Sequence, residues 1–248
     1  MRLKDKVAVV TGGASGFGEG IARRFLEEGA RLVIADIDAD RLSRLGRHLG
    51  ERAQTHATDV SNDTSVADLA THVLKTFGRV DVVVNNAGKG QSPVALDGMD
   101  TEIFESILAV NVRSIFLMAK HFVPSMKKAK AGAILNIAST AGVSPRPNLT
   151  WYNASKGFVI TATRSMAIEL APFGIRVNAL NPVAGETPML KTFLGEDTAE
   201  RRARILATIP LGRLSTPDDI ASAACFLCSD EAAMITGVAL EVDGGRCI

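Results

Sequence analysis

The amino-acid sequence predicts an α/β protein built on a doubly wound, parallel, seven-stranded sheet. Short apolar runs alternate along the chain with longer segments of helical periodicity. The runs are nearly continuous in Val and Ile, as in strands that are buried on both faces. Alternation of strand and helix implies right-handed crossovers between parallel strands. Because no linker or internal repeat interrupts this pattern, we expect a single domain over residues 1–248.

Each predicted element follows from its own residues. The strands are expected where the apolar runs lie: residues 7–11, 31–36, 53–60, 80–88, 132–139, 174–182 and 237–245. The helices are expected where apolar residues recur every three or four positions: residues 18–29, 38–49, 62–78, 101–128, 152–172 and 218–233. The first helix ends in a glycine, and the third opens with capping-type residues, which are typical helix boundaries.

Composition excludes several classes of function. Aromatic residues make up 5% of the chain, so the core is expected to consist of Ala, Val, Ile and Leu. The net charge of +1 gives no basic face for nucleic acid. No apolar run reaches the roughly 18 residues that span a bilayer. The N-terminus lacks the apolar segment and cleavage site of a signal peptide, so we expect a cytoplasmic protein that binds no membrane.

The cysteines and histidines indicate no metal or disulfide site. Three cysteines form an odd set, which argues against a disulfide framework. Cys225 and Cys228 spell C-x-x-C, but they lie in an amphipathic helical segment, where buried structural thiols are the better interpretation. Cys247 stands alone. The histidines show no ligand spacing; they are His48, His56, His72 and His121.

A glycine-rich turn follows the first predicted strand. In "TGGASGFGEG", Gly12, Gly16 and Gly18 lie where the strand must turn sharply into a helix. Glycine lets a pyrophosphate approach the backbone, and the helix N-terminus supplies unpaired N–H groups and partial positive charge. The T-G-x-x-x-G-x-G spacing, between a strand and a helix, therefore predicts a dinucleotide site.

The end of the second predicted strand indicates which dinucleotide binds. Asp36 lies 18 residues after Gly18, where a carboxylate accepts hydrogen bonds from the adenosine ribose hydroxyls and repels a 2′-phosphate. Neither Ile37 nor Ser15 supplies a basic residue for such a phosphate. The sequence therefore predicts NAD as the cofactor and makes NADP less favoured.

The only tyrosine of the chain, Tyr152, stands four residues before Lys156. Residues at i and i+4 share one face of a helix, so both side chains can reach one cleft. Taken alone, such a pair is most often a surface contact. A lysine ammonium beside a phenol favours the phenolate and lowers the tyrosine pKa from about 10. The pair is therefore a candidate for acid–base catalysis.

These motifs together resemble the short-chain dehydrogenase/reductase family over essentially the whole chain. The resemblance rests on the glycine turn, Asp59-Val60 after the third strand, "NNAG" at 85–88, and the Tyr-x-x-x-Lys pair. Further matching positions are Asn111, Ser139 at 13 residues before Tyr152, and "IRVNALNP" followed by Thr187. The resemblance implies a Rossmann-type fold and reversible hydride transfer.

The resemblance also implies the site residues. The implied catalytic residues are Asn111, Ser139, Tyr152 and Lys156: Tyr152 as acid–base, Ser139 on the substrate oxygen, Lys156 tuning Tyr152 and holding the nicotinamide ribose, Asn111 in a proton relay. The implied cofactor-binding residues are Gly12, Ser15, Gly16, Phe17, Gly18, Asp36, Ile37, Asp59, Val60, Asn86, Ala87, Gly88, Tyr152, Lys156, Pro182, Val183 and Thr187.

One position departs from the family pattern, and the substrate pocket is less defined. Val183 replaces the glycine that usually follows the proline. Residues 185–210 are expected to form a helical lid, with an apolar pocket face at Met189, Leu190, Phe193 and Leu194. Other candidates for the pocket walls are Gly90, Gln91, Ser92, Arg146 and Asn148. Arg201, Arg202 and Arg204 fit a solvated helix face better than an anion site.

Three functions follow as alternatives. The leading one is an NAD-dependent dehydrogenase that interconverts a secondary alcohol, such as a sugar, polyol or cyclic alcohol, and its ketone. The second is a 3-oxoacyl-[acyl-carrier-protein] reductase using NADPH, which usually has a basic residue where this chain has Ser15. The third is a non-catalytic nucleotide sensor, which would have a damaged active site. The resemblance and the surplus apolar residues of the helices at 101–128 and 152–172 imply a homotetramer.

Overall fold

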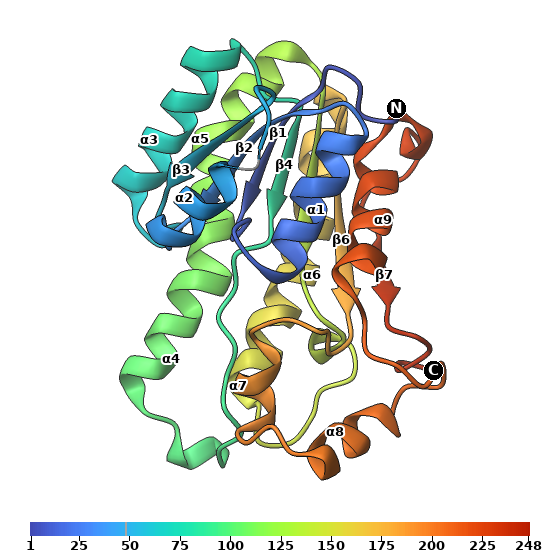
Figure 1. Ribbon diagram of the computed structural model, residues 1–248. Coiled ribbons are helices and arrows are strands. Elements are labelled where there is room, and N and C mark those ends of the chain that lie inside the picture. Colours follow the sequence, from blue (N-terminus) through green and yellow to red (C-terminus); the bar gives the residue numbers. More distant parts are fainter. Residues whose placement is uncertain (48) are drawn as a thin grey trace.

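The computed structural model describes residues 1–47 and 49–248, and a seven-stranded parallel sheet forms its centre (Figure 1). The spatial order is β3-β2-β1-β4-β5-β6-β7, and every neighbouring pair is parallel. The strands are β1 Val7–Thr11, β2 Arg31–Asp36, β3 Ala53–Ala57, β4 Val82–Asn85, β5 Gly132–Ile137, β6 Ile175–Pro182 and β7 Ala239–Val242. The predicted Rossmann-type doubly wound sheet is confirmed.

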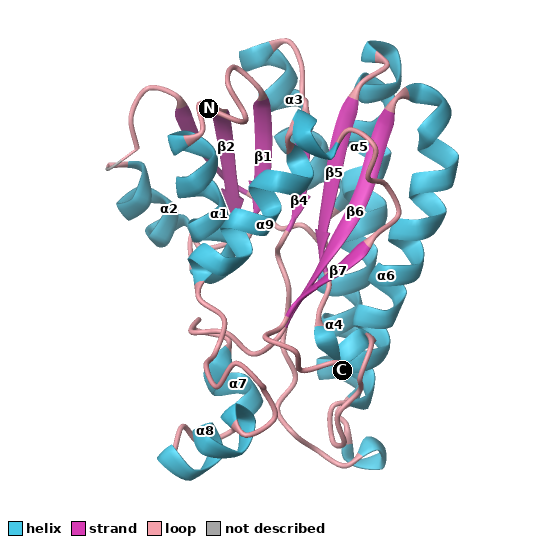
Figure 2. Cartoon of the chain, turned by 90° about the vertical axis from the view of Figure 1, so that its right-hand side faces the viewer, coloured by secondary structure: helices cyan, strands magenta, loops and turns pink. Residues whose placement is uncertain are grey.

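Helices cover both faces of the sheet (Figures 1 and 2). One face carries α1 Gly16–Glu27, α2 Ala39–Gly46 and α9 Pro217–Cys228. The other carries α3 Asp63–Phe77, α5 Ser114–Ala129 and α6 Thr150–Leu170. Successive strand residues alternate between these two cores, with Ala8 and Val10 in one and Val7 and Val9 in the other. Burial on both sides explains why the strands read as continuous apolar runs.

The ends of several strands differ from the prediction. The expected strand residues 58–60, 86–88 and 138–139 have already left the sheet, and the strand expected at 237–245 is paired only over β7. These residues form loops at the carboxyl edge of the sheet instead. The helix expected at 38–49 ends at Gly46, and His48 lies outside the described residues.

The helix expected at 101–128 is interrupted. It consists of α4 Thr101–Leu108, a π-helical turn at Ala109–Arg113, and α5. A π-helical turn adds one residue to the helical repeat and re-aims the side chains that it carries. Here the re-aimed residue is Asn111, which is buried and bonded to two other segments. Short 3₁₀ turns lie at Leu96–Gly98, Thr140–Gly142, Ala171–Phe173 and Asp230–Ala232.

The expected lid consists of two short helices. α7 Leu190–Leu194 and α8 Ala199–Leu206 lie beyond the carboxyl ends of the strands (Figure 2). Cys225 and Cys228 of α9 are free thiols that are buried in the hydrophobic core, as expected for structural cysteines. Within the described residues, no helix combines the length and apolarity needed for a bilayer span.

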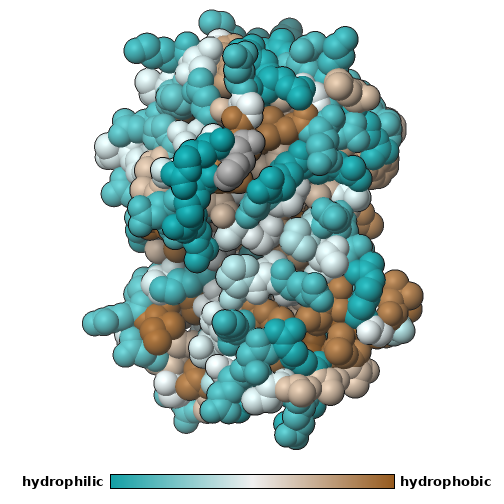
Figure 3. Space-filling view, viewed as in Figure 1, coloured by the Kyte–Doolittle hydropathy of each residue, from teal (hydrophilic) through white to brown (hydrophobic). Residues whose placement is uncertain are grey.

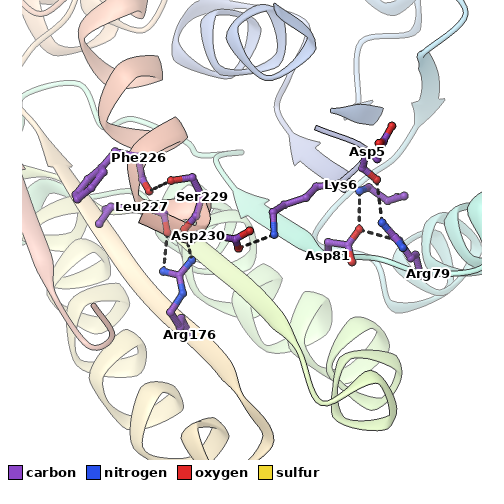
Figure 4. Close-up of polar contacts among 10 residues, drawn as sticks. Asp5, Lys6, Arg79, Asp81, Arg176, Phe226, Leu227, Ser229 and Asp230 are labelled. Carbon is purple, nitrogen blue, oxygen red and sulfur yellow. Dashed lines mark hydrogen bonds and ion pairs between the residues drawn. The ribbon is translucent and has the colours of Figure 1, made fainter. Parts of the chain in front are cut away.

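At the amino ends of the strands, Arg176 of β6 holds the C-terminal end of α9 (Figure 4). Its guanidinium donates to the carbonyls of Leu227 at 2.7 Å, Ser229 at 3.0 Å and Ile235 at 3.3 Å. Nearby, Lys6 pairs with Asp230 at 2.8 Å. The carbonyls at a helix end lack intrahelical donors, so a cation that satisfies them stabilises the helix.

Replacing Arg176 with methionine is expected to lower the free energy of unfolding by about 2–3 kcal/mol, because several charge-assisted hydrogen bonds to part-buried carbonyls are lost. Urea denaturation of the cofactor-free protein measures this change. Arg204→Met is the matched control, since Arg204 forms only an exposed pair with Glu200. Equal stability of the Arg176 variant and the wild type would contradict the capping role.

Candidate active site

One cavity of about 620 Å³ lies at the carboxyl edge of the sheet, beneath α7. Figure 3 shows a hollow between the upper part of that view, with α1 and α2, and the lower part, with α7 and α8. Ligands of open parallel sheets bind at this edge, where the strand order reverses, here between β1 and β4. Of the catalytic and cofactor-binding residues named from the sequence, only Gly18 and Asn111 do not line it.

The glycine turn forms one end of the cavity. Gly12 has φ +60°, and a Cβ there would lie 2.8 Å from the Ala87 Cα. A Cβ on Gly18 would lie 2.2 Å from the Gly12 carbonyl oxygen, so Gly18 permits close packing of the turn rather than lining the cavity. Asn86 Nδ2 donates to the carbonyls of Thr11 and Gly12 at 2.9 and 3.0 Å. The "NNAG" segment thereby fixes the shape of the turn.

The start of α1 is open to a ligand. Ser15 is the N-cap residue with an extended backbone, and its side chain makes no capping hydrogen bond within the described structure. The first N–H groups of the helix therefore keep their donor capacity for an anion, which the helix dipole also favours. This arrangement fits the pyrophosphate of a dinucleotide.

Asp36 is held at the same end of the cavity, at the end of β2. Its carboxylate oxygens accept the N–H of Ala14 at 3.0 Å and the N–H of Asp38 at 3.1 Å. Arg41 of α2 also lines this end and pairs with Asp38 at 3.0 Å. Sequence reasoning missed Arg41, because only the folded α2 brings a residue five positions beyond Asp36 back to the cavity. We call this end, formed by residues 12–17, 36–41 and 58–60, the turn half.

The other end, the tyrosine half, is formed by Ser139, Arg146, α6 and α7. Tyr152 and Lys156 lie on the same face of α6, and each is 5% exposed. The Lys156 ammonium donates to the Ile137 carbonyl at 2.8 Å and lies 5.8 Å from the Tyr152 ring centroid. Ser139 lines the cavity with them and accepts the Ala141 N–H at 3.1 Å. The fold thus brings Ser139, Tyr152 and Lys156 to one site, as their spacing in the sequence predicted.

Burial changes the protonation of this pair. It raises the pKa of Tyr152 above its usual value, and the Ser139 hydroxyl and the Arg146 charge oppose that effect. It lowers the pKa of Lys156 from 10.5 to about 8. The sequence led us to expect that Lys156 would lower the tyrosine pKa. Together with the charge of an oxidised cofactor, that lowering stays a prediction.

Asn111 lies behind the cavity and joins three segments. Its side-chain oxygen accepts the Lys89 N–H at 2.8 Å, and its amide donates to the Lys89 carbonyl and to Ser155 Oγ, each at 3.0 Å. Ser155 in turn donates to the Tyr152 carbonyl at 2.7 Å. The π-helical turn therefore ties the loop after β4 to the first turns of α6, which carry Tyr152. The proton-relay role of Asn111 remains a prediction.

Three of the residues suggested for the pocket walls do not line the cavity. Gln91 is buried away from the cavity, where it accepts the Tyr152 N–H at 2.9 Å and donates to the Asn148 carbonyl at 3.0 Å. It thus supplies the cap that the start of α6 lacks. Ser92 and Asn148 do not line the cavity either, whereas Gly90 and Arg146 do. The Trp151 ring packs against Phe104 of α4 rather than facing the cleft.

The lid covers the tyrosine half with apolar side chains. Met189, Leu190 and Phe193 line the cavity, and the Phe193 and Tyr152 ring centroids are 5.0 Å apart. Leu194 instead packs into a cluster that contains Val183, Leu190, Ile209 and Leu214. Val183, the departure from the family pattern, therefore anchors α7 as well as lining the cavity.

The three arginines of the lid do not line the cavity. Each pairs with an acid of the lid itself: Arg201 with Glu196, Arg202 with Asp197 and Arg204 with Glu200. The prediction of a solvated helix face is confirmed.

Comparison with known proteins identifies this arrangement. A family model described as enoyl-(acyl carrier protein) reductase matches residues 12–246. The chain belongs to the short-chain dehydrogenase/reductase family. It is therefore an oxidoreductase that acts on CH–OH groups with NAD(P). The residues of the turn half fit such a cofactor, because the glycines leave the backbone open and Asp36 faces the cavity.

Family members of known sequence or structure match the whole chain. 4-Formylbenzenesulfonate dehydrogenase TsaC1/TsaC2 of Comamonas testosteroni is 43% identical, with 100% of both chains covered. Cis-4-hydroxycyclohexanecarboxylate dehydrogenase of Sinomonas cyclohexanicum is 39% identical over 97% of this chain and 96% of the relative. A crystal structure of 3-ketoacyl-(acyl-carrier-protein) reductase from Brucella melitensis, complexed with NADH, is 49% identical with a TM-score of 0.94, covering 99% of this chain and 100% of the other.

Proposed function

We propose that this chain is an NAD-dependent dehydrogenase that interconverts a secondary alcohol and its ketone. One observation carries the proposal: Asp36 and the group of Ser139, Tyr152 and Lys156 line opposite halves of the same cavity. A dinucleotide whose adenosine ribose meets Asp36 extends from the turn half toward Tyr152. The reacting carbon of the substrate then lies beside the only tyrosine of the chain.

The side chains divide the chemistry among them. In the oxidative direction, the Tyr152 oxygen accepts the proton of the substrate hydroxyl, and the Ser139 hydroxyl donates to the substrate oxygen. The Lys156 ammonium binds the nicotinamide ribose and supplies positive charge near Tyr152 when it is protonated. The bound nicotinamide supplies the hydride acceptor. The apolar lid excludes water from the tyrosine half, which strengthens these polar interactions.

A second candidate is reduction of a 3-oxoacyl-[acyl-carrier-protein]. The similarity to the Brucella melitensis reductase favours it, and that structure contains NADH. Cofactor preference alone therefore does not separate the candidates. The names of the two dehydrogenase relatives instead specify small ring compounds, which suit a covered pocket with an apolar wall.

Initial rates with both substrate classes separate the candidates. We expect NAD⁺-coupled oxidation of small cyclic secondary alcohols to exceed reduction of acetoacetyl-CoA, compared as kcat/KM, with either NADH or NADPH as reductant. A higher kcat/KM for the thioester would overturn the proposal in favour of the reductase. Tyr152→Phe in parallel shows that each measured rate belongs to this site.

Replacing Asp36 with serine is expected to lower the ratio of kcat/KM for NAD⁺ over NADP⁺ at least about tenfold. The change removes a carboxylate that repels a 2′-phosphate, and it leaves Arg41 on the same wall of the cavity to attract one. Asp40→Ser is the matched control, because Asp40 is exposed on α2 and does not line the cavity. An unchanged ratio in the Asp36 variant would remove Asp36 from the cofactor site.

We also propose a homotetramer. Ile103, Phe116 and Phe158, on the helices named for this role from the sequence, stay 48%, 62% and 45% exposed in the single chain. Others that we assigned there are buried within the chain: Ile107, Met118, Val159 and Ile160. Exposed large apolar side chains on adjacent helices favour association. A single-chain mass by light scattering would contradict the tetramer.

A further inference from the structure

Charges are distributed unevenly in the cavity. Its carboxylates, Asp36 and Asp59, both lie in the turn half. Among the described residues that line the cavity outside the turn half there is no carboxylate. The cationic side chains there are Arg146 and Lys156 of the tyrosine half and Lys89 of the loop after β4. Lys156 is already committed to Ile137 and to the cofactor ribose. The positive charge of the tyrosine half therefore has no obvious role in binding a neutral substrate.

Arg146 is the unusual member of this set. It is half-buried, and its guanidinium carbon lies 5.8 Å from the Phe193 ring centroid. In the described part of the chain, no acid lies within ion-pairing distance of its guanidinium, and no hydrogen bond of the guanidinium is formed. Burial, and then the charge of nearby Arg246, lower the pKa of Arg146. Removing a cation from water without a partner is unfavourable, so this geometry favours an anionic ligand.

A hydrogen bond holds the backbone of Arg146 in place. Asn153 Nδ2 of α6 donates to the Arg146 carbonyl at 2.8 Å, which ties this loop to the helix of Tyr152. Arg202 of α8 and Arg213 of the loop that follows it each pair with an acid, Asp197 and Asp219 respectively. Arg146 alone of these three lines the cavity.

Phe193 determines the chemistry of the substrate segment between its anionic group and its reacting carbon. Its ring centroid lies 5.0 Å from the Tyr152 ring centroid and 5.8 Å from the guanidinium carbon of Arg146, so Phe193 is a neighbour of both side chains. A substrate whose hydroxyl reaches Tyr152 and whose anion reaches Arg146 must therefore pass along an apolar ring. A guanidinium can bind two oxygens of a carboxylate, or of a tetrahedral oxyanion such as a sulfonate, through two parallel N–H donors.

We propose that Arg146 binds the anionic group of the substrate, and that the substrate is a small carboxylate or sulfonate whose secondary alcohol is separated from the anion by an apolar spacer. This inference deepens the proposed function and rests on it for the position of the alcohol. The bound anion pairs with the charge of Arg146 beneath the lid. A neutral alcohol would leave the guanidinium without a partner, so the site should select anionic alcohols over neutral ones.

Calorimetry on the protein saturated with NADH tests anion binding without turnover. The probes are cyclohexanecarboxylate, cyclohexanesulfonate and the neutral isostere cyclohexanecarboxamide. We expect at least one anion to bind about tenfold or more tightly than the carboxamide, and the two anions show which headgroup fits. Arg146→Met is expected to abolish the preference, and Arg146→Lys to restore part of it. Arg246→Met removes a neighbouring cation that does not line the cavity, so it should keep the preference.

Equal binding of anions and carboxamide, no measurable binding of either anion, or an undiminished preference in Arg146→Met would overturn the inference. Loss of the preference in Arg246→Met alone would also overturn it. The proposed function fails differently. Wild-type protein that prefers the anions but oxidises no hydroxycyclohexane with NAD⁺ would refute the dehydrogenase and keep the anion site. Equal kcat/KM for oxidation of 4-hydroxycyclohexanecarboxylate and of its carboxamide would keep the dehydrogenase and refute the anion site.

Discussion

Replacing Tyr152 with phenylalanine is expected to lower kcat for alcohol oxidation by about 10²–10⁴-fold, the usual contribution of a positioned acid–base group. The change removes the phenolic oxygen, the atom that we propose accepts the substrate proton. The ring stays in contact with Phe193 and on the buried face of α6, so the fold and the cofactor site should persist. Steady-state rates measure kcat, and calorimetric titration with NADH measures whether the cofactor site is intact.

Trp151→Phe is the matched control for this substitution. Trp151 is the adjacent aromatic residue, but its ring packs against Phe104 outside the cavity. We expect it to keep the wild-type kcat. Near-full turnover by Tyr152→Phe, with NADH binding unchanged, would show that another group carries the proton and would refute the assignment.

Replacing Lys156 with methionine is expected to lower kcat by about 10²-fold or more and, at the same time, to stabilise the cofactor-free protein at pH 7. Burial lowers the pKa of Lys156 to about 8, so below that pH the folded chain holds a buried ammonium. The depressed pKa corresponds to a cost of about 3 kcal/mol, and the lost hydrogen bond to Ile137 offsets about 1 kcal/mol of the gain.

The pH dependence identifies the cause of this stabilisation. Between about pH 8 and the usual lysine pKa of 10.5, the unfolded chain binds more protons at Lys156 than the folded chain. The contribution of Lys156 to stability therefore rises with pH across that window, and the advantage of Lys156→Met should shrink. Urea denaturation at pH 7 and pH 9.5 measures it. Lys75→Met, on an exposed position of α3, should show no such change, and an advantage that does not depend on pH would contradict the explanation.

The sheet and most of the cavity are predictable from the sequence for local reasons. Strands buried on both faces need continuous apolar runs, and the turn after β1 needs glycine at position 12, where φ is +60°. Asp36 and Tyr152 follow because a strand end and a helical i,i+4 spacing fix where those side chains point. In these cases the chain within a few residues decides the structure.

Other features depend on contacts between distant segments. The π-helical turn holds Asn111 against Lys89 and Ser155, and helical periodicity in the sequence contains no sign of the inserted residue. Gln91 caps the Tyr152 N–H from 61 positions away. The guanidinium of Arg146 lies beside Phe193 of α7, and Asn153 of α6 holds the Arg146 carbonyl. The tyrosine pKa likewise depends on how deeply the folded chain buries the phenol.

Calorimetric titration of the wild-type protein with NADH and, separately, with NADPH tests the assignment of the cavity most directly. Asp36 is held in the turn half by two backbone N–H groups, where we propose that its carboxylate meets the adenosine ribose of the cofactor. We expect NADH to bind at least about tenfold more tightly, because the carboxylate repels a 2′-phosphate. Tighter binding of NADPH would contradict the role of Asp36 and direct the search to 3-oxo substrates.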